Sequence, residues 1–155
     1  MPTNGKRPPG RRLSLFAIDL EAEEHGTWES LPAPLDAFEF RLRSLHCEDV
    51  QDYLADQSMR EQRLNRNVEL SGKAQAALFR RSVGAKLIVD WRGLLDDEGK
   101  EIPFSHELAL ELMTARKWRH IAEAVSSAVI EKSRLRFEEG SEEGKASESL
   151  SVTAS

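Results

Sequence analysis

IVDWRGLLDDEGKEIPFSHELALELM, residues 88–113, carries the strongest local signals in the 155-residue chain. Within it, Asp96 to Gly99 has the composition of a tight turn, and Gly99 can supply the left-handed backbone position that such turns use. Short apolar pieces flank the turn, Leu94 and Leu95 before it and Ile102 after it. We therefore predict a short β-like finger here, placed between two helices.

A helix is predicted to start directly after the finger. Ser105 is a suitable N-cap, Glu107 places an acid in the first turn, and Phe104 can act as an apolar staple before the cap. The buried face of this helix is expected to consist of Leu108, Leu112 and Met113. Trp91, on the other side of the finger, is expected to plug the core at the end of the preceding helix.

Two further helices are predicted before residue 88. In the first, which follows His46, Val50, Tyr53 and Leu54 share one stripe, and Leu64 is a candidate to extend it. The acids in its first turn suit the helix dipole; they are Glu48, Asp49 and Asp52. The second has apolar residues at helical spacing: Leu70, Ala74, Ala77, Leu78, Ala85 and Ile88. The signals for a break between the two are Asn65, Asn67, Ser71 and Gly72.

The N-terminal part of the chain favours strands. Residues 13–20 alternate partly between apolar and polar side chains, and residues 26–29 form a short β-prone piece. Residues 38–43, FEFRLR, alternate with a clean period of two, so that Phe38, Phe40 and Leu42 share one face. A small antiparallel sheet is the natural interpretation.

The last predicted helix runs from Ala115 to Phe137. Its apolar stripe consists of Trp118, Ile121, Ala122, Val125, Ala128 and Val129. Lys132, Arg134 and Arg136 lie in its final turns, where cations suit the dipole. The predicted fold is therefore α+β, with a small N-terminal antiparallel sheet followed by about four helices.

Charge divides the chain into three parts. The 22 basic and 27 acidic residues give a net charge of −5. Residues 1–12 carry +4, residues 13–137 carry −5, and residues 138–155 carry −4. The two ends have the composition of chain that does not fold, so we predict a disordered basic arm, a single domain over 13–137 and a disordered acidic, Ser/Glu-rich tail.

The sequence contains no recognisable catalytic constellation. His106-Glu107 begins like a zinc-protease helix, but Leu110 stands where the second histidine would be needed. A calcium loop with Gly99 at its sixth position would need carboxylates at Leu94 and Ser105. Cys47 is the single cysteine, and its acidic neighbours would raise the pKa of a thiol, so a structural role is favoured. We predict no catalytic, cofactor-binding or metal-binding residues.

Membrane and nucleic-acid roles are disfavoured. The longest apolar run, Leu87 to Val89, is far too short to span a bilayer, which favours a soluble cytosolic protein. Arg60, Arg63 and Arg66 could line one helix face and neutralise phosphates. Because the domain is acidic and no aromatic residues are interleaved with these arginines, a solvated helix face is the favoured interpretation.

The stretch 88–113 resembles the small tail assembly chaperones of long-tailed bacteriophages. In that family a Val-x-Asp-Trp-like helix end is followed by an acidic-Gly turn and an Ile/Leu-Pro-Phe-Ser-like helix start. The Gly-x-Trp element at 26–28 and the strand at 38–43 are also similar, so the resemblance covers residues 13–139; the Ser-rich end, 141–155, departs from it. The family-motif positions are Asp90, Trp91, Gly99, Pro103, Phe104 and Ser105.

The resemblance implies a non-enzymatic assembly factor of the host cytoplasm that is generally absent from the mature virion. Such factors bind the tape measure protein and help to recruit tail tube subunits, and many are also made in a longer, frameshifted form. A long, helical and apolar tape measure protein needs reversible cover before assembly, and helices at 70–88 and 115–137 could provide grooves for it. The same stripes could instead form the domain's own core.

Four apolar residues of the finger are the predicted contacts for a partner or a second copy, because protruding apolar groups tend to anchor interfaces. They are Leu94, Leu95, Ile102 and Phe104. Three alternatives stay open: a structural tail or head-completion protein retained in the virion, a nucleic-acid-binding regulator that uses the Arg60/Arg63/Arg66 face, and an enzyme of unknown class.

Overall fold

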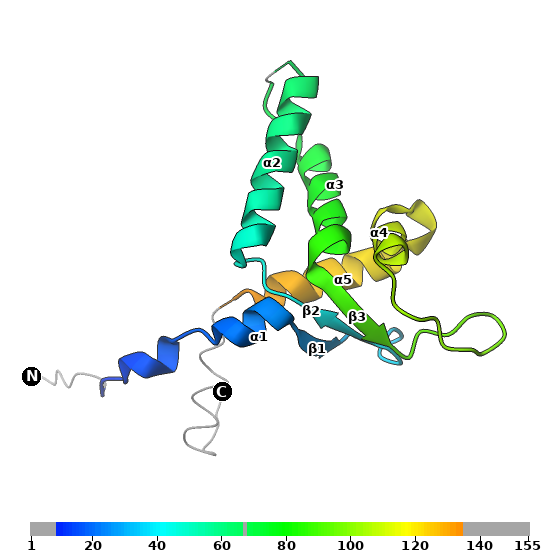
Figure 1. Ribbon diagram of the computed structural model, residues 1–155, viewed down its shortest axis with the longest axis horizontal. Coiled ribbons are helices and arrows are strands. Elements are labelled where there is room, and N and C mark those ends of the chain that lie inside the picture. Colours follow the sequence, from blue (N-terminus) through cyan, green and yellow to red (C-terminus); the bar gives the residue numbers. More distant parts are fainter. Residues whose placement is uncertain (1–8, 67, 135–155) are drawn as a thin grey trace, which may run out of the picture. The chain divides into compact units, whose positions relative to one another are not determined.

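The computed structural model describes residues 9–66 and 68–134 (Figure 1). The chain divides into two compact units, and the second, Leu20–Arg134, contains the strands and the α-helices of the described residues. Three antiparallel strands and five α-helices make it an α+β fold, as predicted. The predicted acidic tail, 138–155, and residues 1–8 of the predicted basic arm lie outside the described residues.

The prediction of a strand over residues 13–20 was wrong. Leu13–Phe16 forms a 3₁₀ turn, and α1, Leu20–His25, begins where the strand was expected to end. Every residue from 13 to 20 is exposed. The partial alternation of the sequence therefore places no apolar face against a core, and nothing stabilises a strand here. Glu21 and Glu23 in the first turn of α1 suit the dipole of a helix.

The sheet contains β1 (Thr27–Ser30), β2 (Glu39–Leu42) and β3 (Ile88–Arg92), in the order β1-β2-β3. The strand β3 is a correction, because a helix was expected to continue through Ile88. The helix instead ends in a π-helical turn, Val83–Leu87, and the chain then pairs with β2. Ile88, Val89 and Trp91 are β-branched or aromatic and therefore fit a half-buried pleated surface.

One face of the sheet carries the core. Phe40 and Leu42 on β2 are fully buried, Trp91 on β3 is nearly so, and all three share a cluster with side chains of α4 and α5. Lys132, near the end of α5, contacts Thr27 and lies 3.7 Å from a Glu29 carboxylate oxygen on β1. This helix is thereby tied to the edge strand.

The helices α2 (Glu48–Leu64), α3 (Gly72–Ser82), α4 (His106–Thr114) and α5 (Arg119–Lys132) follow. The oxygen of Ser105 accepts a hydrogen bond from the Leu108 amide at 3.1 Å, which confirms the predicted N-cap. The last helix is shorter than the predicted 115–137: a 3₁₀ turn, Arg116–Trp118, precedes α5, and residues 135–137 lie outside the described residues.

The predicted finger is present between β3 and α4. Its turn is closed by Asp96, whose Oδ1 accepts hydrogen bonds from the amides of Glu98 and Lys100 at 2.9 Å each. Gly99 has a φ of +84°, the left-handed conformation expected of it. A single antiparallel bridge joins Leu95 to Glu101.

Candidate functional site

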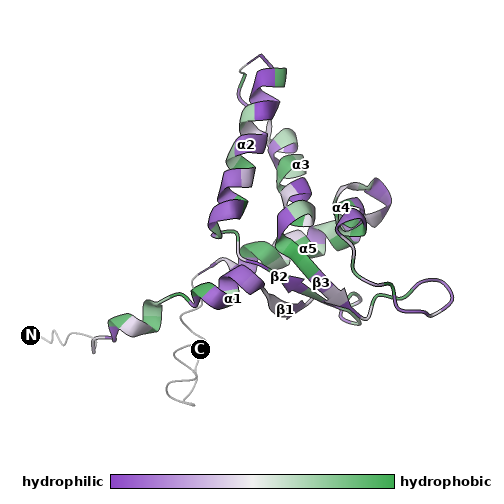
Figure 2. Ribbon diagram, in the orientation of Figure 1, coloured by the Kyte–Doolittle hydropathy of each residue, from purple (hydrophilic) through white to green (hydrophobic). Residues whose placement is uncertain are grey.

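The helices α2 and α3 form an antiparallel hairpin that extends away from the sheet and from α4 and α5 (Figure 1). Although α2 has 17 residues, Val50 alone among them is buried, and in α3 the buried residues are Leu78 and Ser82. Figure 2 shows that most of α2 is hydrophilic. The hairpin therefore has little core of its own beyond its base.

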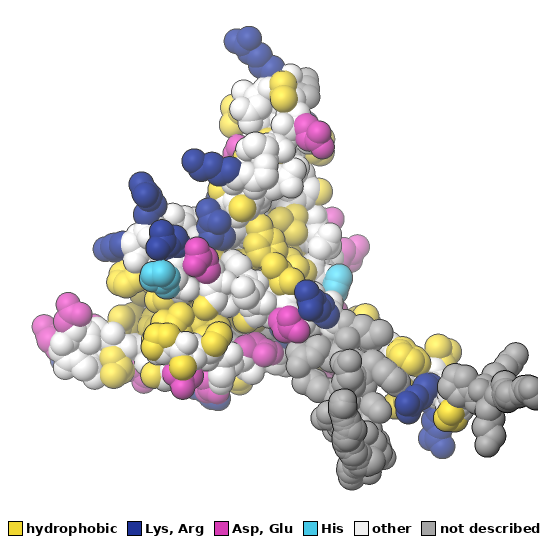
Figure 3. Space-filling view, turned by 180° about the vertical axis from the view of Figure 1, so that it is seen from behind, with side chains coloured by type: hydrophobic (Ala, Val, Ile, Leu, Met, Phe, Trp, Pro, Cys, Tyr) yellow, Lys and Arg dark blue, Asp and Glu magenta, His cyan; other side chains and the backbone are white. Residues whose placement is uncertain are grey.

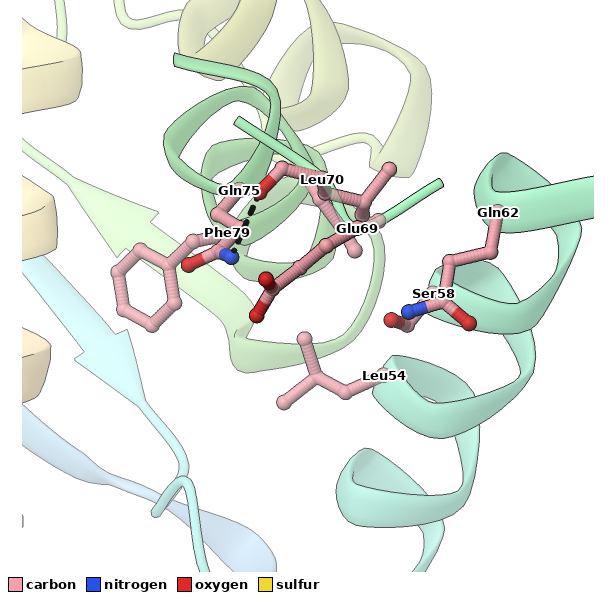
Figure 4. Close-up of a pocket in the computed structure, with 8 residues that line it drawn as sticks. Leu54, Ser58, Gln62, Glu69, Leu70, Gln75 and Phe79 are labelled. Atoms are coloured by element: carbon pink, nitrogen blue, oxygen red, sulfur yellow. Dashed lines mark hydrogen bonds between the residues drawn. The ribbon is translucent and has the colours of Figure 1, made fainter. Parts of the chain in front are cut away.

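A pocket of about 390 Å³ lies between the two helices (Figure 4). Three of its residues come from α2, two from the connection and three from α3. Its apolar lining consists of Leu54, Leu70, Leu78 and Phe79, and its polar lining of Ser58, Gln62, Glu69 and Gln75. We call these eight residues the hairpin groove.

Local sequence explains how the groove forms. Ser71 caps α3 by accepting a hydrogen bond from the Ala74 amide at 3.1 Å, which fixes where the second helix begins. The side-chain Nε2 of Gln75 donates a hydrogen bond to the Leu70 carbonyl at 3.1 Å, which holds the connection against α3. Glu69 and Leu70 are thereby held at the outer end of the groove.

The groove combines apolar surface with free polar groups. Within the described residues, the side chains of Ser58, Gln62 and Glu69 make no hydrogen bond or ion pair with the protein. Leu54 and Phe79 are half-buried beside them. Such a surface can accept the apolar stripe of a helix while its polar groups bond to the partner.

Large apolar side chains are also exposed near the tip of the hairpin. Met59 is 52% exposed, Leu64 is 78% exposed and Val68 is 62% exposed. The sequence made Leu64 a candidate to extend the stripe of Val50 and Leu54. Its exposure shows that it does not. At the foot of the hairpin, Figure 3 shows a further hydrophobic patch with Lys and Arg side chains beside it.

The predicted partner residues of the finger are divided between core and surface. Leu94 is only 6% exposed and belongs to the core, and Ile102 and Phe104 are half-buried against that core. Leu95 is 58% exposed. Of these four side chains, Leu95 alone protrudes far enough to be mainly available to a partner.

The family-motif residues serve mainly to build this region. The Trp91 indole donates to the Ile102 carbonyl at 2.8 Å, and its ring meets that of Phe104 edge to face, with centroids 4.9 Å apart. Asp90 accepts a hydrogen bond from the Trp91 amide at 2.8 Å. Ser105 and Gly99 provide the cap and the turn described above, and Pro103 is exposed.

Comparison with known proteins identifies the family. The model of the YdaY prophage protein family matches residues 46–148, which is more than half of the chain. The chain belongs to the YdaY prophage protein family. It is therefore a phage-derived protein. No curated protein and no solved structure matches it.

The matched range contains every residue of the hairpin groove and both helices of the hairpin. The strands β1 and β2 lie before it. From the sequence, helices at 70–88 and 115–137 were predicted to provide grooves. That prediction did not include Leu54, Ser58 and Gln62 on α2, which line the hairpin groove.

One cluster of possible metal ligands occurs in the described part of this YdaY family member. Ligand atoms of Glu24, Cys47 and Asp49 lie within 4.8 Å of one another. The Arg43 guanidinium already binds there, donating to both carboxylate oxygens of Asp49 at 2.7 and 3.1 Å and to the Glu24 carbonyl at 2.8 Å. The buried Cys47 thiol donates to the Glu23 carbonyl at 3.2 Å. The arrangement is a structural ion pair at the start of α2.

The ion pair predicts a small pH dependence of stability. The hydrogen bond from Arg43, aided by its charge, holds the pKa of the Asp49 carboxyl below its ordinary value. Because that pKa is lower in the folded state, the stabilisation is present above the unfolded pKa of about 3.9 and is lost as pH falls through the folded value. Asp49 is half-exposed, which screens the interaction.

We expect Asp49→Asn to lower the free energy of unfolding by about 0.2–1 kcal/mol at pH 7. At an acidic pH below the lowered folded pKa of Asp49, the difference from wild type should vanish. Urea unfolding at both pH values measures this, with Asp97→Asn, an exposed change in the finger, as the control. An equal loss at both pH values would show that the charge of Asp49 is irrelevant.

The remaining sequence candidates are dispersed. Arg60 and Arg63 lie on α2, but Arg66 lies beyond its end with a φ of +58°, so the three do not continue one helix face. The four histidines belong to separate segments: His25, His46, His106 and His120. None of the helices in the described residues is long and apolar enough to cross a membrane.

Proposed function

We propose that this YdaY family member is a non-enzymatic phage tail assembly chaperone that acts in the host cytoplasm by binding the tape measure protein. The hairpin groove is the observation that carries the proposal. An amphipathic helix of the tape measure protein would lay its apolar face between α2 and α3, against Leu54, Leu70 and Phe79. The prophage family and the resemblance of residues 88–113 to tail chaperones support the same role.

The proposed role is to cover the apolar stripe of the tape measure protein reversibly. A long helical protein with an exposed apolar stripe associates with itself unless that stripe is covered before assembly. A groove with four apolar and four polar residues can cover such a stripe without forming a permanent core. The protein would then be released as tail tube subunits assemble, and it would be absent from the mature virion.

The test measures how the full chain binds the tape measure protein encoded by the same prophage. Ser58→Trp places a large side chain in the groove, and we expect it to weaken binding by at least about tenfold, because it occupies the space that the partner helix needs. Isothermal titration calorimetry with purified proteins gives the affinity, and circular dichroism confirms that the variant is folded.

Ala76→Trp is the matched control, since Ala76 is an exposed residue of α3 outside the groove. Unchanged binding by a folded Ser58→Trp variant would remove the groove from the proposal. Mass spectrometry of purified particles distinguishes the chaperone from a structural tail or head-completion protein. The structural alternative predicts that this chain is found in the virion, and the chaperone proposal predicts that it is absent.

A further inference from the structure

A second surface of α2, distinct from the groove, carries an ordered pattern of exposed charged side chains. Asp52, Asp56, Met59 and Arg63 are all exposed. They are spaced by four, three and four residues, which places them along one stripe of an α-helix. The groove residues of α2, Leu54, Ser58 and Gln62, form a different stripe. We call the stripe of Asp52, Asp56, Met59 and Arg63 the outer stripe.

Charge along the outer stripe is segregated by position. Its carboxylates, Asp52 and Asp56, lie toward the base of the hairpin, and Arg63 lies toward the tip. The helix dipole favours acids in the first turn and bases in the last, but its effect fades within one turn. Asp52 was predicted to lie in the first turn, but it is the fifth residue of α2, and the acids of that turn are Glu48 and Asp49. The dipole therefore accounts neither for Asp52 nor for Asp56, the ninth residue.

This pattern is complementary to itself when reversed. If two copies of α2 pair antiparallel, with the two-fold axis between Asp56 and Met59, Asp52 of each copy faces Arg63 of the other. The two residues of one copy are about 16 Å apart along the helix, at 1.5 Å per residue, so both ion pairs form at once. A parallel pairing would place like charges together.

The axis of this pairing also passes beside an exposed apolar group. Met59, 52% exposed, would face Asp56 of the second copy, because the two positions lie at equal distances on either side of the axis. Asp56 already pairs with Arg60 in its own helix at 3.5 Å, with both side chains largely exposed. Of the charged residues of the outer stripe, Asp52 and Arg63 make no ion pair with the described residues. A two-fold interface is the usual solution for a surface that complements itself.

We infer that the outer stripe is an antiparallel self-association surface, and that its partner is a second copy of this chain. The proposed dimer is weak and salt-sensitive, because its ion pairs are at the surface. The groove lies on another stripe of the same helix, so a dimer presents two grooves. The inference goes beyond the proposed function and does not depend on it.

A charge swap tests the pairing in the full chain. Asp52→Arg places like charges opposite Arg63, and Arg63→Asp places like charges opposite Asp52, so we expect each to weaken dimerisation by about tenfold. The double variant D52R/R63D restores opposite charges at both contacts and is expected to recover dimerisation. Sedimentation equilibrium over a range of concentrations, at low and high salt, gives the dissociation constants.

Glu111→Arg, an exposed charge reversal on α4, is the matched control and should leave dimerisation unchanged. Two results would overturn the inference: a wild-type chain that stays monomeric at all concentrations at low salt, or a double variant no better than the two single variants. Binding of the tape measure protein, measured on the same samples, reports separately on the proposed function.

Discussion

Trp91→Ala is expected to lower the free energy of unfolding by about 3–5 kcal/mol. Trp91 is 4% exposed and packs edge to face against Phe40, with centroids 6.0 Å apart, as well as against Phe104. Its removal leaves a cavity where the sheet, the finger and the start of α4 meet. It also leaves the Ile102 carbonyl without the indole hydrogen bond.

Urea unfolding followed by circular dichroism measures this loss. Trp91→Phe keeps an aromatic ring but not the indole donor, and should cost less than the alanine variant, about 1–2 kcal/mol. Trp28→Ala is the control on the other face of the sheet, where the Trp28 ring is half-buried under Arg92, 4.0 Å away. If Trp91→Ala were as mild as Trp28→Ala, Trp91 would not be a core residue.

The second large effect is expected at Gly84, in the π-helical turn that follows α3. A Cβ atom at this position would lie 2.9 Å from the Leu110 Cα and 3.0 Å from the Ala109 carbonyl oxygen, both backbone atoms of α4. Backbone cannot move aside as a flexible side chain can. Gly84→Val should therefore push α4 away and cost at least about 3 kcal/mol.

Gly72→Val is the matched control for this prediction. Gly72 is the first residue of α3, and a Cβ there would meet nothing within 4 Å. We expect its change in stability to stay within about 0.5 kcal/mol. Thermal unfolding of both variants provides the comparison, and an equally stable Gly84→Val variant would refute the close approach of the π-helical turn to α4.

Local sequence signals predicted the parts of the fold that depend on neighbouring residues. The alternation of residues 38–43 indicated β2, and Ser105 and Gly99 indicated the cap and the turn, because each of these structures is formed within a few residues. The strand β3 was missed because it follows a helix without a break. The pairing of β3 with β2 places Trp91 opposite Phe40, which lies 51 residues earlier in the chain (91 − 40). A pairing over that separation is not visible in local periodicity.

The candidate site was only half predicted for a similar reason. Amphipathic helices at 70–88 and 115–137 were expected to provide grooves, and Leu70 and Leu78 of the first of these line the hairpin groove. The other side depends on how α2 packs against α3, which brings Leu54, Ser58 and Gln62 opposite them. The apolar residues of the finger were predicted to contact a partner because of their hydrophobicity. Leu94, one of these residues, instead belongs to the core.

We propose that the hairpin groove binds a helix of the tape measure protein. A photo-crosslinking amino acid at Gln62, inside the groove, tests this most directly when the chain is co-expressed with that protein. We predict a crosslink from position 62 to an amphipathic helical segment of the tape measure protein, and none from Ala76 outside the groove. Equal crosslinking from both positions, or none from position 62 in a folded chain, would contradict the account.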